Sequence, residues 1–125
     1  AKARGQRLIV IGRDPAPGVH DITILSDTIE GAAQRVRIAA FGKTHDIRIP
    51  LLGRFQVDNA LMAAALAIGC GVSPERAFAS LETLEGARGR LEFVGAKDGA
   101  PVVVDYAHKP GALETVLDAA RPFAK

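Results

Sequence analysis

The chain has 125 residues, 48% of them hydrophobic and 24% charged, which is the balance of roughly one globular domain and not of a disordered chain. The formal net charge is only +2 and the basic residues are spread along the sequence, so we expect no nucleic-acid partner. The one cysteine, Cys70, excludes a disulfide framework and favours a reducing cytoplasm, and we expect its side chain to be buried. No apolar run approaches the roughly 20 residues that span a bilayer, so no membrane partner is expected. The absence of an initial Met favours a chain cut from something longer.

The first fifty residues predict β structure. An apolar segment at residues 8–11 predicts a short strand, and residues 12–18, which are rich in Gly and Pro, predict a loop. Three later segments alternate apolar and polar residues with a period of two, as antiparallel strands with one buried face do. These are residues 22–25, 35–40 and 46–49. The Gly42-Lys43 corner predicts a hairpin between the last two.

Two helices are predicted in the middle of the chain. The first begins near Asp58 or Asn59, either of which could cap it, and runs to about Cys70. Because apolar residues nearly encircle this helix, we expect it to be buried on several sides. Ser73-Pro74-Glu75 begins the second helix with a capping hydroxyl and a proline at the first helical position. Its predicted apolar stripe is Ala77, Phe78, Leu81 and Leu84, and residues 85–89 predict a loop at a boundary.

The last third predicts a hairpin followed by a helix. Strands at residues 91–96 and 102–106 are joined by Lys97-Asp98-Gly99, a strong turn signal. The continuous Val102-Val103-Val104 favours a strand covered on both faces. A helix then begins at Pro110, with an apolar stripe of Leu113, Val116, Leu117, Ala120 and Phe123. One strand–helix unit leaves a helix face and a sheet edge without partners, so we infer the beginning of a larger α/β domain.

Two patterns that suggest chemistry have simpler explanations. Gly42-Lys43-Thr44 looks like the end of a phosphate-binding loop, but Arg37 stands where that motif needs its first glycine and both flanks are strand-like. A hairpin turn explains it better. His20, His45 and His108 are far apart in the sequence and have no Cys or second His at ligand spacing, so we expect no metal site. We expect the side chains of His20 and His45 to be solvated.

Three short segments carry the candidate site residues. The predicted strand at residues 102–106 runs into Asp105 near its end, and His108 follows it; in open α/β sheets ligands bind at that end. Asp105 could accept hydrogen bonds from ribose hydroxyls, or it could merely cap the next helix. Asn59 could read an adenine edge through its amide, or it could be a cap. Arg90 could bind a phosphate, or it could be an ordinary surface residue.

Taken in order, these segments resemble the Mur ligase family. Residues 53–61, GRFQVDNAL, look like the family's G-x-F-N-x-x-N-x-L segment, and residues 89–92, GRLE, look like its GR-x-E. Residues 105–114, DYAHKPGALE, are close to DYAHTPDALE, and the tyrosine is typical of the ligase that extends UDP-N-acetylmuramoyl-L-alanyl-D-glutamate. The sequence departs from the family at Gln56, Lys109 and Gly111, where asparagine, threonine and aspartate are common.

The resemblance implies an α/β fold, α+β within these residues, made of parts of two domains. Residues 1–88 would be the end of a P-loop-type central ATPase domain with a small antiparallel sheet. Residues 89–125 would begin a Rossmann-like C-terminal ligase domain with its first β-hairpin and helix. The family's nucleotide-site residues would correspond to Asn59 by the adenine, Arg90 at the phosphate or ribose, Asp105 near the ribose and His108 in the interdomain cleft.

The resemblance also implies an activity. The family activates a carboxylate with ATP and Mg²⁺ through an acyl phosphate, and an amine of meso-diaminopimelate or lysine then displaces the phosphate. The phosphate-loop lysine, the metal ligands and the amino-acid pocket are not among these residues, so we expect the chain alone to be inactive. Two alternatives remain: part of a folate polyglutamate ligase, against which Tyr106 argues, and a non-catalytic nucleotide-binding or interaction module.

Overall fold

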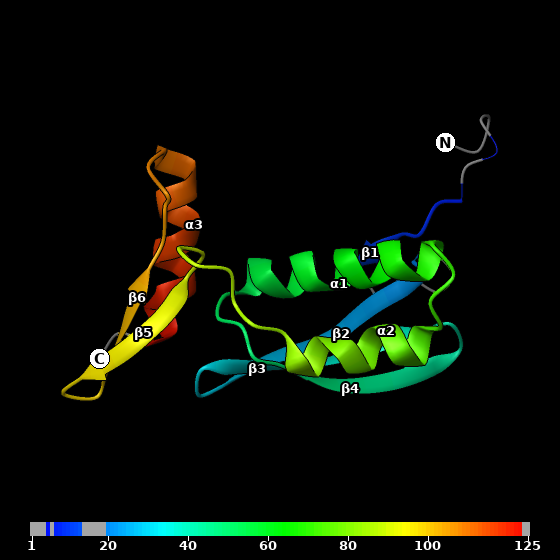
Figure 1. Cartoon of the computed structure of the whole chain (residues 1–125), viewed down its shortest axis with the longest axis horizontal. Helices are drawn as coiled ribbons and strands as arrows, with labels where there is room; N and C mark the ends of the chain where they lie inside the picture. The colour runs from blue at the N-terminus through cyan, green and yellow to red at the C-terminus, as the bar shows by residue number, and fades with distance from the viewer. Residues whose placement is uncertain (1–4, 6, 14–19, 124–125) are drawn as a thin grey trace.

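A computed structural model describes residues 5, 7–13 and 20–123 (Figure 1). Their regular elements in chain order are β1 (Ile11–Gly12), β2 (Ile22–Glu30), β3 (Ala33–Ala40), β4 (Lys43–Ile49), α1 (Arg54–Gly69), α2 (Pro74–Ser80), β5 (Glu92–Lys97), β6 (Ala100–Val104) and α3 (Pro110–Ala120). Short 3-10 helices, η2 (Leu81–Thr83) and η3 (Arg121–Phe123), follow α2 and α3. The predicted mixture of strands and helices is therefore confirmed.

The larger sheet has the strand order β1-β2-β3-β4. β2, β3 and β4 are antiparallel neighbours, which confirms the antiparallel hairpin predicted between the last two, whereas β1 pairs in parallel with β2. The strand predicted at residues 8–11 is wrong in extent, because only Ile11 and Gly12 pair as a strand. Just before it, the carboxylate of Asp21 accepts a hydrogen bond from the Val10 amide at 2.8 Å, so a side chain replaces a strand partner. Most of the predicted loop at residues 12–18 lies outside the described residues.

The turn between β3 and β4 explains the false phosphate-loop pattern. Phe41 and Gly42 both have positive φ angles, 49° and 79°, as a two-residue hairpin turn with the right twist requires. Lys43 and Thr44 already belong to β4. The hairpin prediction is confirmed, with the turn one residue earlier than expected.

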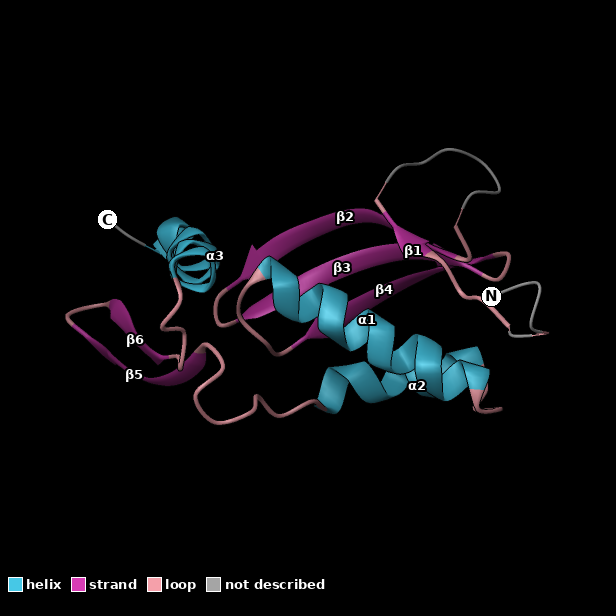
Figure 2. Cartoon of the chain, turned by 90° about the horizontal axis from the view of Figure 1, so that it is seen from above, coloured by secondary structure: helices cyan, strands magenta, loops and turns pink. Residues whose placement is uncertain are grey.

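Helices α1 and α2 cover one face of the larger sheet (Figure 2). The inward residues of three strands and the facing residues of both helices form one hydrophobic core. The core contains Ile22, Ile24, Val36, Ile38, Ala40, Ile47, Ile49, Val57, Ala60, Leu61, Ala64, Ala65, Ile68, Ala77, Phe78 and Leu81. Burying an aliphatic side chain of this size stabilises a fold by roughly 1.5–3 kcal/mol. The part formed by β2–β4, α1 and α2 therefore has a hydrophobic core of its own.

Helix α1 begins four residues before the predicted start. Its N-cap is Gly53, with a φ of 89°, and no side chain caps it, so both capping predictions, for Asp58 and Asn59, are wrong. The start is fixed from outside the helix, because the buried Gln34 amide donates to the carbonyls of Leu51 and Gly53 at 3.0 and 2.9 Å. Tertiary hydrogen bonds thus override the local capping signal.

The outward face of α1 also differs from expectation. Met62 is 51% exposed and Leu66 is 73% exposed, so within the described residues the helix is buried on one side only. Cys70 is exposed, not buried, because it is the C-cap of α1 and lies beyond the packed stripe. The start of α2 is confirmed, since the Ser73 hydroxyl accepts from the Arg76 amide. The helix ends at Ser80, before the last two residues of the predicted stripe: Leu81 lies in η2 and Leu84 follows it, although both still pack against the core.

The second part consists of the β5–β6 hairpin and α3, beside the beginning of α1 (Figures 1 and 2). Asp98 and Gly99 make the predicted turn with φ angles of 53° and 79°. No residue of α3 is buried, and Leu113 and Leu117 of its apolar stripe are exposed. Val102 and Val104 are more than 40% exposed, so the expectation of a strand covered on both faces is not met in the described part of the chain.

Candidate functional site

All four predicted site residues line one cavity. It has a volume of about 440 Å³ and lies between the first turns of α1, the loop after β6 and one side of α3. Its lining is Phe55, Asn59, Arg90, Asp105, Tyr106, Ala107, His108, Lys109, Ala112, Thr115 and Val116. Asn59, Arg90 and Asp105 come from three separate segments, so the fold brings together what the sequence only suggested piecewise.

Asn59 reaches the cavity from α1. Phe55 and Asn59 are four residues apart and therefore share one face of the helix. Asn59 is exposed, and within the described residues its amide has no hydrogen-bond partner in the protein. Since α1 begins at Arg54, Asn59 lies inside the helix and does not cap it, so its amide is available to a ligand.

Asp105 organises the loop after β6. Its two carboxylate oxygens accept hydrogen bonds from the Leu91 amide at 2.8 Å and the Ala107 amide at 2.7 Å. It does not cap α3, whose N-cap is Lys109, so the capping interpretation is wrong. Each carboxylate oxygen has a further lone pair, so Asp105 retains capacity for a ligand hydroxyl.

Arg90 is the last residue of a turn over residues 87–90, which its amide closes by donating to the Ala87 carbonyl at 3.1 Å. The Gly89 amide donates to the Glu92 carboxylate at 2.8 Å, and the Gly89 carbonyl accepts from the Tyr106 amide at 3.0 Å. Gly89 has a φ of 68°, and a Cβ there would lie 2.2 Å from the Tyr106 ring, so only glycine fits. Two residues of the GRLE segment, Gly89 and Glu92, thus hold the turn that presents the arginine.

Gln56 has a role that sequence reasoning left open. Its amide donates to the Arg90 carbonyl at 3.0 Å and so ties α1 to the turn. The side chain does not line the cavity. The sequence placed Gln56 in the same motif as Asn59, three residues before it. The sequence could not show its hydrogen-bond partner, because Arg90 lies 34 residues away.

The end of the cavity at His108 and Lys109 is basic. The Nδ1 atom of His108 is 3.0 Å from the Tyr106 carbonyl, and since a carbonyl only accepts, Nδ1 carries the proton and Nε2 is left for another partner. Lys109, whose role was open, lies beside it. The lining contains two cations, Arg90 and Lys109, and one carboxylate, that of Asp105, so its net charge favours an anionic ligand.

A network of ion pairs lies near the start of α1. Asp27 pairs with Arg13 at 2.6 Å and with Arg54 at 2.9 Å, and Arg13 also reaches Asp58. Burial disfavours the charged form of Asp27, but its hydrogen bonds from Arg54 and Arg13 outweigh this and hold the pKa of the carboxyl below its ordinary value. The network fastens α1 to β2.

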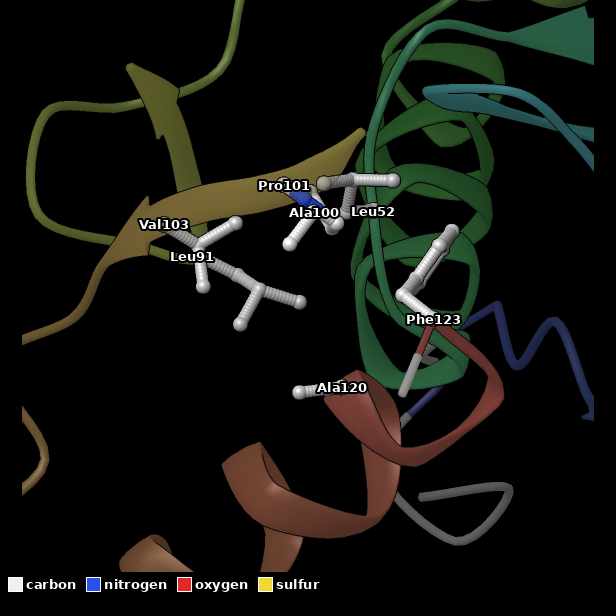
Figure 3. A pocket seen from close by; sticks show the side chains of 7 residues that line it. All are labelled: Leu52, Leu91, Ala100, Pro101, Val103, Ala120 and Phe123. Atoms are coloured by element: carbon white, nitrogen blue, oxygen red, sulfur yellow. The ribbon is translucent and has the colours of Figure 1, made fainter. Parts of the chain in front are cut away.

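A second cavity, of about 220 Å³, has an entirely different lining (Figure 3). Apolar side chains from the hairpin, the end of α3 and the segment before α1 surround it: Leu52, Leu91, Ala100, Pro101, Val103, Ala120 and Phe123. It offers no charge or hydrogen-bonding side chain to a polar ligand.

The other histidines lie away from the site. His45 packs its ring against Phe78 with centroids 4.8 Å apart, and His20 lies against Gly12. Among residues 5, 7–13 and 20–123 there is no group of three or more His, Cys, Asp or Glu that could hold a metal ion. In the same residues, no helix is long and apolar enough to cross a membrane.

Comparisons with known proteins agree with the motifs. The family model described as Mur ligase, glutamate ligase domain, matches residues 89–125. The whole chain is 49% identical to the UDP-N-acetylmuramoyl-L-alanyl-D-glutamate--2,6-diaminopimelate ligase of Bradyrhizobium diazoefficiens and covers 26% of it. The chain thus spans about a quarter of the length of the curated relatives it matches.

Solved structures share the fold. UDP-N-acetylmuramoylalanyl-D-glutamyl-2,6-diaminopimelate--D-alanyl-D-alanyl ligase from Acinetobacter baumannii superposes with a TM-score of 0.75 at 24% identity, over 94% of this chain and 25% of that one. Folylpolyglutamate synthetase from Lactobacillus casei gives 0.68 at 22% identity, over 84% of this chain and 28% of that one. At these identities the likeness concerns fold alone. Together with the sequence match over the whole chain, it confirms the predicted resemblance and fold class: the chain belongs to the Mur ligase family.

Proposed function

We propose that the cavity binds ATP, and that the whole protein is an ATP-dependent ligase adding meso-diaminopimelate, or lysine, to UDP-N-acetylmuramoyl-L-alanyl-D-glutamate in the cytoplasm. The observation that carries the proposal is the convergence of Asn59, Arg90, Asp105 and His108 on one cavity. The name of the Bradyrhizobium relative supports diaminopimelate as the amino acid.

The lining suits the chemistry of a nucleotide. Phe55 and Val116 supply apolar walls for a base, and Asn59 supplies an amide whose donor and acceptor match an adenine edge. The spare lone pairs of Asp105 suit ribose hydroxyls, and the cations Arg90 and Lys109 suit phosphates.

Within the reaction, these residues bind and orient. ATP supplies the phosphoryl group that converts the substrate carboxylate into an acyl phosphate, a better electrophile. The cations of the cavity neutralise phosphate charge, and the hydrogen-bonded loop of Asp105 holds them in place before the ligand arrives. We propose that the Mg²⁺ ligands and the amino-acid pocket lie outside these 125 residues.

We further propose that residues 1–88 are the end of the central ATPase domain and residues 89–125 the start of the C-terminal ligase domain. The family match that begins at residue 89 supports this boundary. The placement of the cavity supports it too, since Asn59 lies on one side of the boundary and Arg90 and Asp105 on the other.

Calorimetric titration of ATP into the chain tests the proposal. We expect weak binding that Arg90→Ala weakens about tenfold, because a charge-assisted hydrogen bond is lost. Arg88→Ala is the matched control, since Arg88 is exposed in the same loop but does not line the cavity. No ATP binding, or equal losses from both variants, would contradict the site.

The chain by itself should not turn over substrate. A coupled assay of ADP release, with UDP-N-acetylmuramoyl-dipeptide and diaminopimelate, is expected to give no substrate-dependent signal from the 125 residues. A folate polyglutamate ligase is the alternative that shares this fold, and the same assay with a folate substrate in the whole protein separates the two activities. A non-catalytic nucleotide-binding or interaction module would give neither activity in the whole protein.

A further inference from the structure

The two parts of the molecule meet over a small joint. A Cβ on Gly53 would lie 2.9 Å from a methyl of Leu91 and 3.2 Å from the Cβ of Ala119, so the parts approach closely there. Between residues 21–83 and 89–123, the Gln56 amide provides the one side-chain hydrogen bond found in the described part of the chain. Apolar contact therefore brings the parts together, and one directed bond sets where the Arg90 turn lies.

That bond completes the backbone hydrogen bonding of Arg90. The Arg90 amide donates to the Ala87 carbonyl at 3.1 Å, and its carbonyl accepts from Gln56 at 3.0 Å. The next amide, that of Leu91, donates to Asp105. The Arg90 side chain has no ion pair or hydrogen bond in the described residues, so the placement of its backbone decides where the side chain enters the cavity.

We propose that Gln56 is a positioning residue of the nucleotide site: it acts through the Arg90 carbonyl and couples the start of α1 to the placement of the Arg90 guanidinium. The inference rests on the proposed ATP site. Gln56 itself does not line the cavity, so it touches no ligand there. The side-chain length matters, because an asparagine amide would end roughly 1.5 Å short and break a bond that is already 3.0 Å long.

A double-mutant cycle on the 125-residue chain tests this. Gln56→Met keeps the side-chain length without the amide, and Gln56→Asn keeps the amide without the length. Each is expected to weaken ATP binding about two- to tenfold, the range for one lost neutral hydrogen bond. In an Arg90→Ala background the same substitutions should have no further effect, because the group they position is gone.

Thr83→Val is the matched control, since it removes another side-chain bond to a carbonyl, Thr83 to Ser80, remote from the cavity. It should leave ATP affinity unchanged. Wild-type affinity in Gln56→Met, or an undiminished penalty in the Arg90→Ala background, would overturn the proposal. The ligand-free chain provides an independent measurement: the ¹³C shift of the Arg90 carbonyl should move in Gln56→Met and not in Thr83→Val.

The ATP titration and the carbonyl shift distinguish failure of the nucleotide site from failure of the positioning role of Gln56. If the wild-type chain binds no ATP but the carbonyl shift moves as expected, the nucleotide site fails while the link from Gln56 to the turn stands. If ATP binds and the carbonyl shift does not move, the positioning role of Gln56 fails and the nucleotide site stands.

Discussion

The two parts of the chain are both rich in apolar residues, but their burial differs greatly. In the part formed by β2–β4, α1 and α2, Leu61 and Ile38 are completely buried. In the part formed by β5, β6 and α3, Leu117 is 62% exposed and Leu113 is 43% exposed, although both belong to the apolar stripe of a helix. An apolar stripe therefore indicates that a helix can pack against another element. Its residues are buried only where that element is present.

The two parts of the chain also contribute differently to the cavity. The well-packed part contributes Asn59 and Phe55 to the cavity, whereas the sparsely packed part contributes Arg90, Asp105 and His108. The site is thus assembled across a small joint between a part with a buried core and a part with little core of its own. Substitutions in the buried core of the first part should act on folding, and those at the cavity and the joint, in either part, should act on the site.

The largest expected effect comes from a matched pair of leucines. Leu61→Ala should destabilise the chain by about 3 kcal/mol, because it leaves a cavity in a closed core. Leu117→Ala should cost less than about 0.5 kcal/mol, since its side chain is mostly solvated. Urea unfolding followed by circular dichroism measures both. Equal losses would contradict the difference between the two parts.

The next effect concerns the joint. Gly53→Ala combines a positive φ with a Cβ only 2.9 Å from Leu91, and we expect a cost of about 2–3 kcal/mol. Gly42→Ala is the control, because its φ is also positive but nothing lies within 4 Å of the new Cβ, so only about 1 kcal/mol is expected. Thermal unfolding compares them. Equal costs would mean that the joint tolerates the added methyl group.

A smaller effect should depend on pH. Asp27 has a lowered pKa in the folded chain, so its ion pairs stabilise the fold above its ordinary value of 3.8, and that stabilisation is lost as the pH falls through the lower folded value. Asp27→Asn should therefore cost about 1–2 kcal/mol at pH 7 and progressively less at an acidic pH below 3.8, as the wild-type carboxyl also becomes protonated. Urea unfolding at both pH values is the measurement. Glu75→Gln removes a solvated pair with Lys43 and should have a smaller effect. A pH-independent loss in Asp27→Asn would show that the charge is not responsible.

The smallest expected effect concerns Lys109. Lys109→Thr should weaken ATP binding about two- to fivefold at low salt, and the difference should shrink as salt screens the exposed charge. Lys97→Thr, at the end of β5 and away from the cavity, should not change affinity. Calorimetry at two ionic strengths compares them. A salt-independent loss at Lys109 would point to packing instead of charge.

Local signals in the sequence predicted most elements but not their tertiary surroundings. The turn at Asp98-Gly99 and the cap at Ser73 follow from residues adjacent in the chain, and both predictions are confirmed. The start of α1 was missed because Gln34, about twenty residues earlier, holds the Gly53 carbonyl. Cys70 was expected inside because cysteine is usually buried, but its place at a helix end decided otherwise.

In the candidate site, too, the sequence indicated suitable side chains but not their tertiary contacts. The motifs indicated Asn59 and Asp105 as side chains with suitable chemistry, and the structure brings them to one cavity. The sequence could not reveal that Asp105 would bind two backbone amides instead of capping α3, or that Gln56 would reach Arg90. Those contacts depend on how the two parts meet, which no local pattern encodes.

Intermolecular nuclear Overhauser effects between ATP and the labelled chain locate the bound nucleotide. We expect contacts from the adenine and ribose protons to the methyl groups of Ala112 and Val116 and to the side-chain amide of Asn59, all of which line the cavity. Contacts confined to Leu52, Val103 and Phe123 of the apolar cavity, or no contacts at saturating ATP, would contradict the proposed nucleotide site.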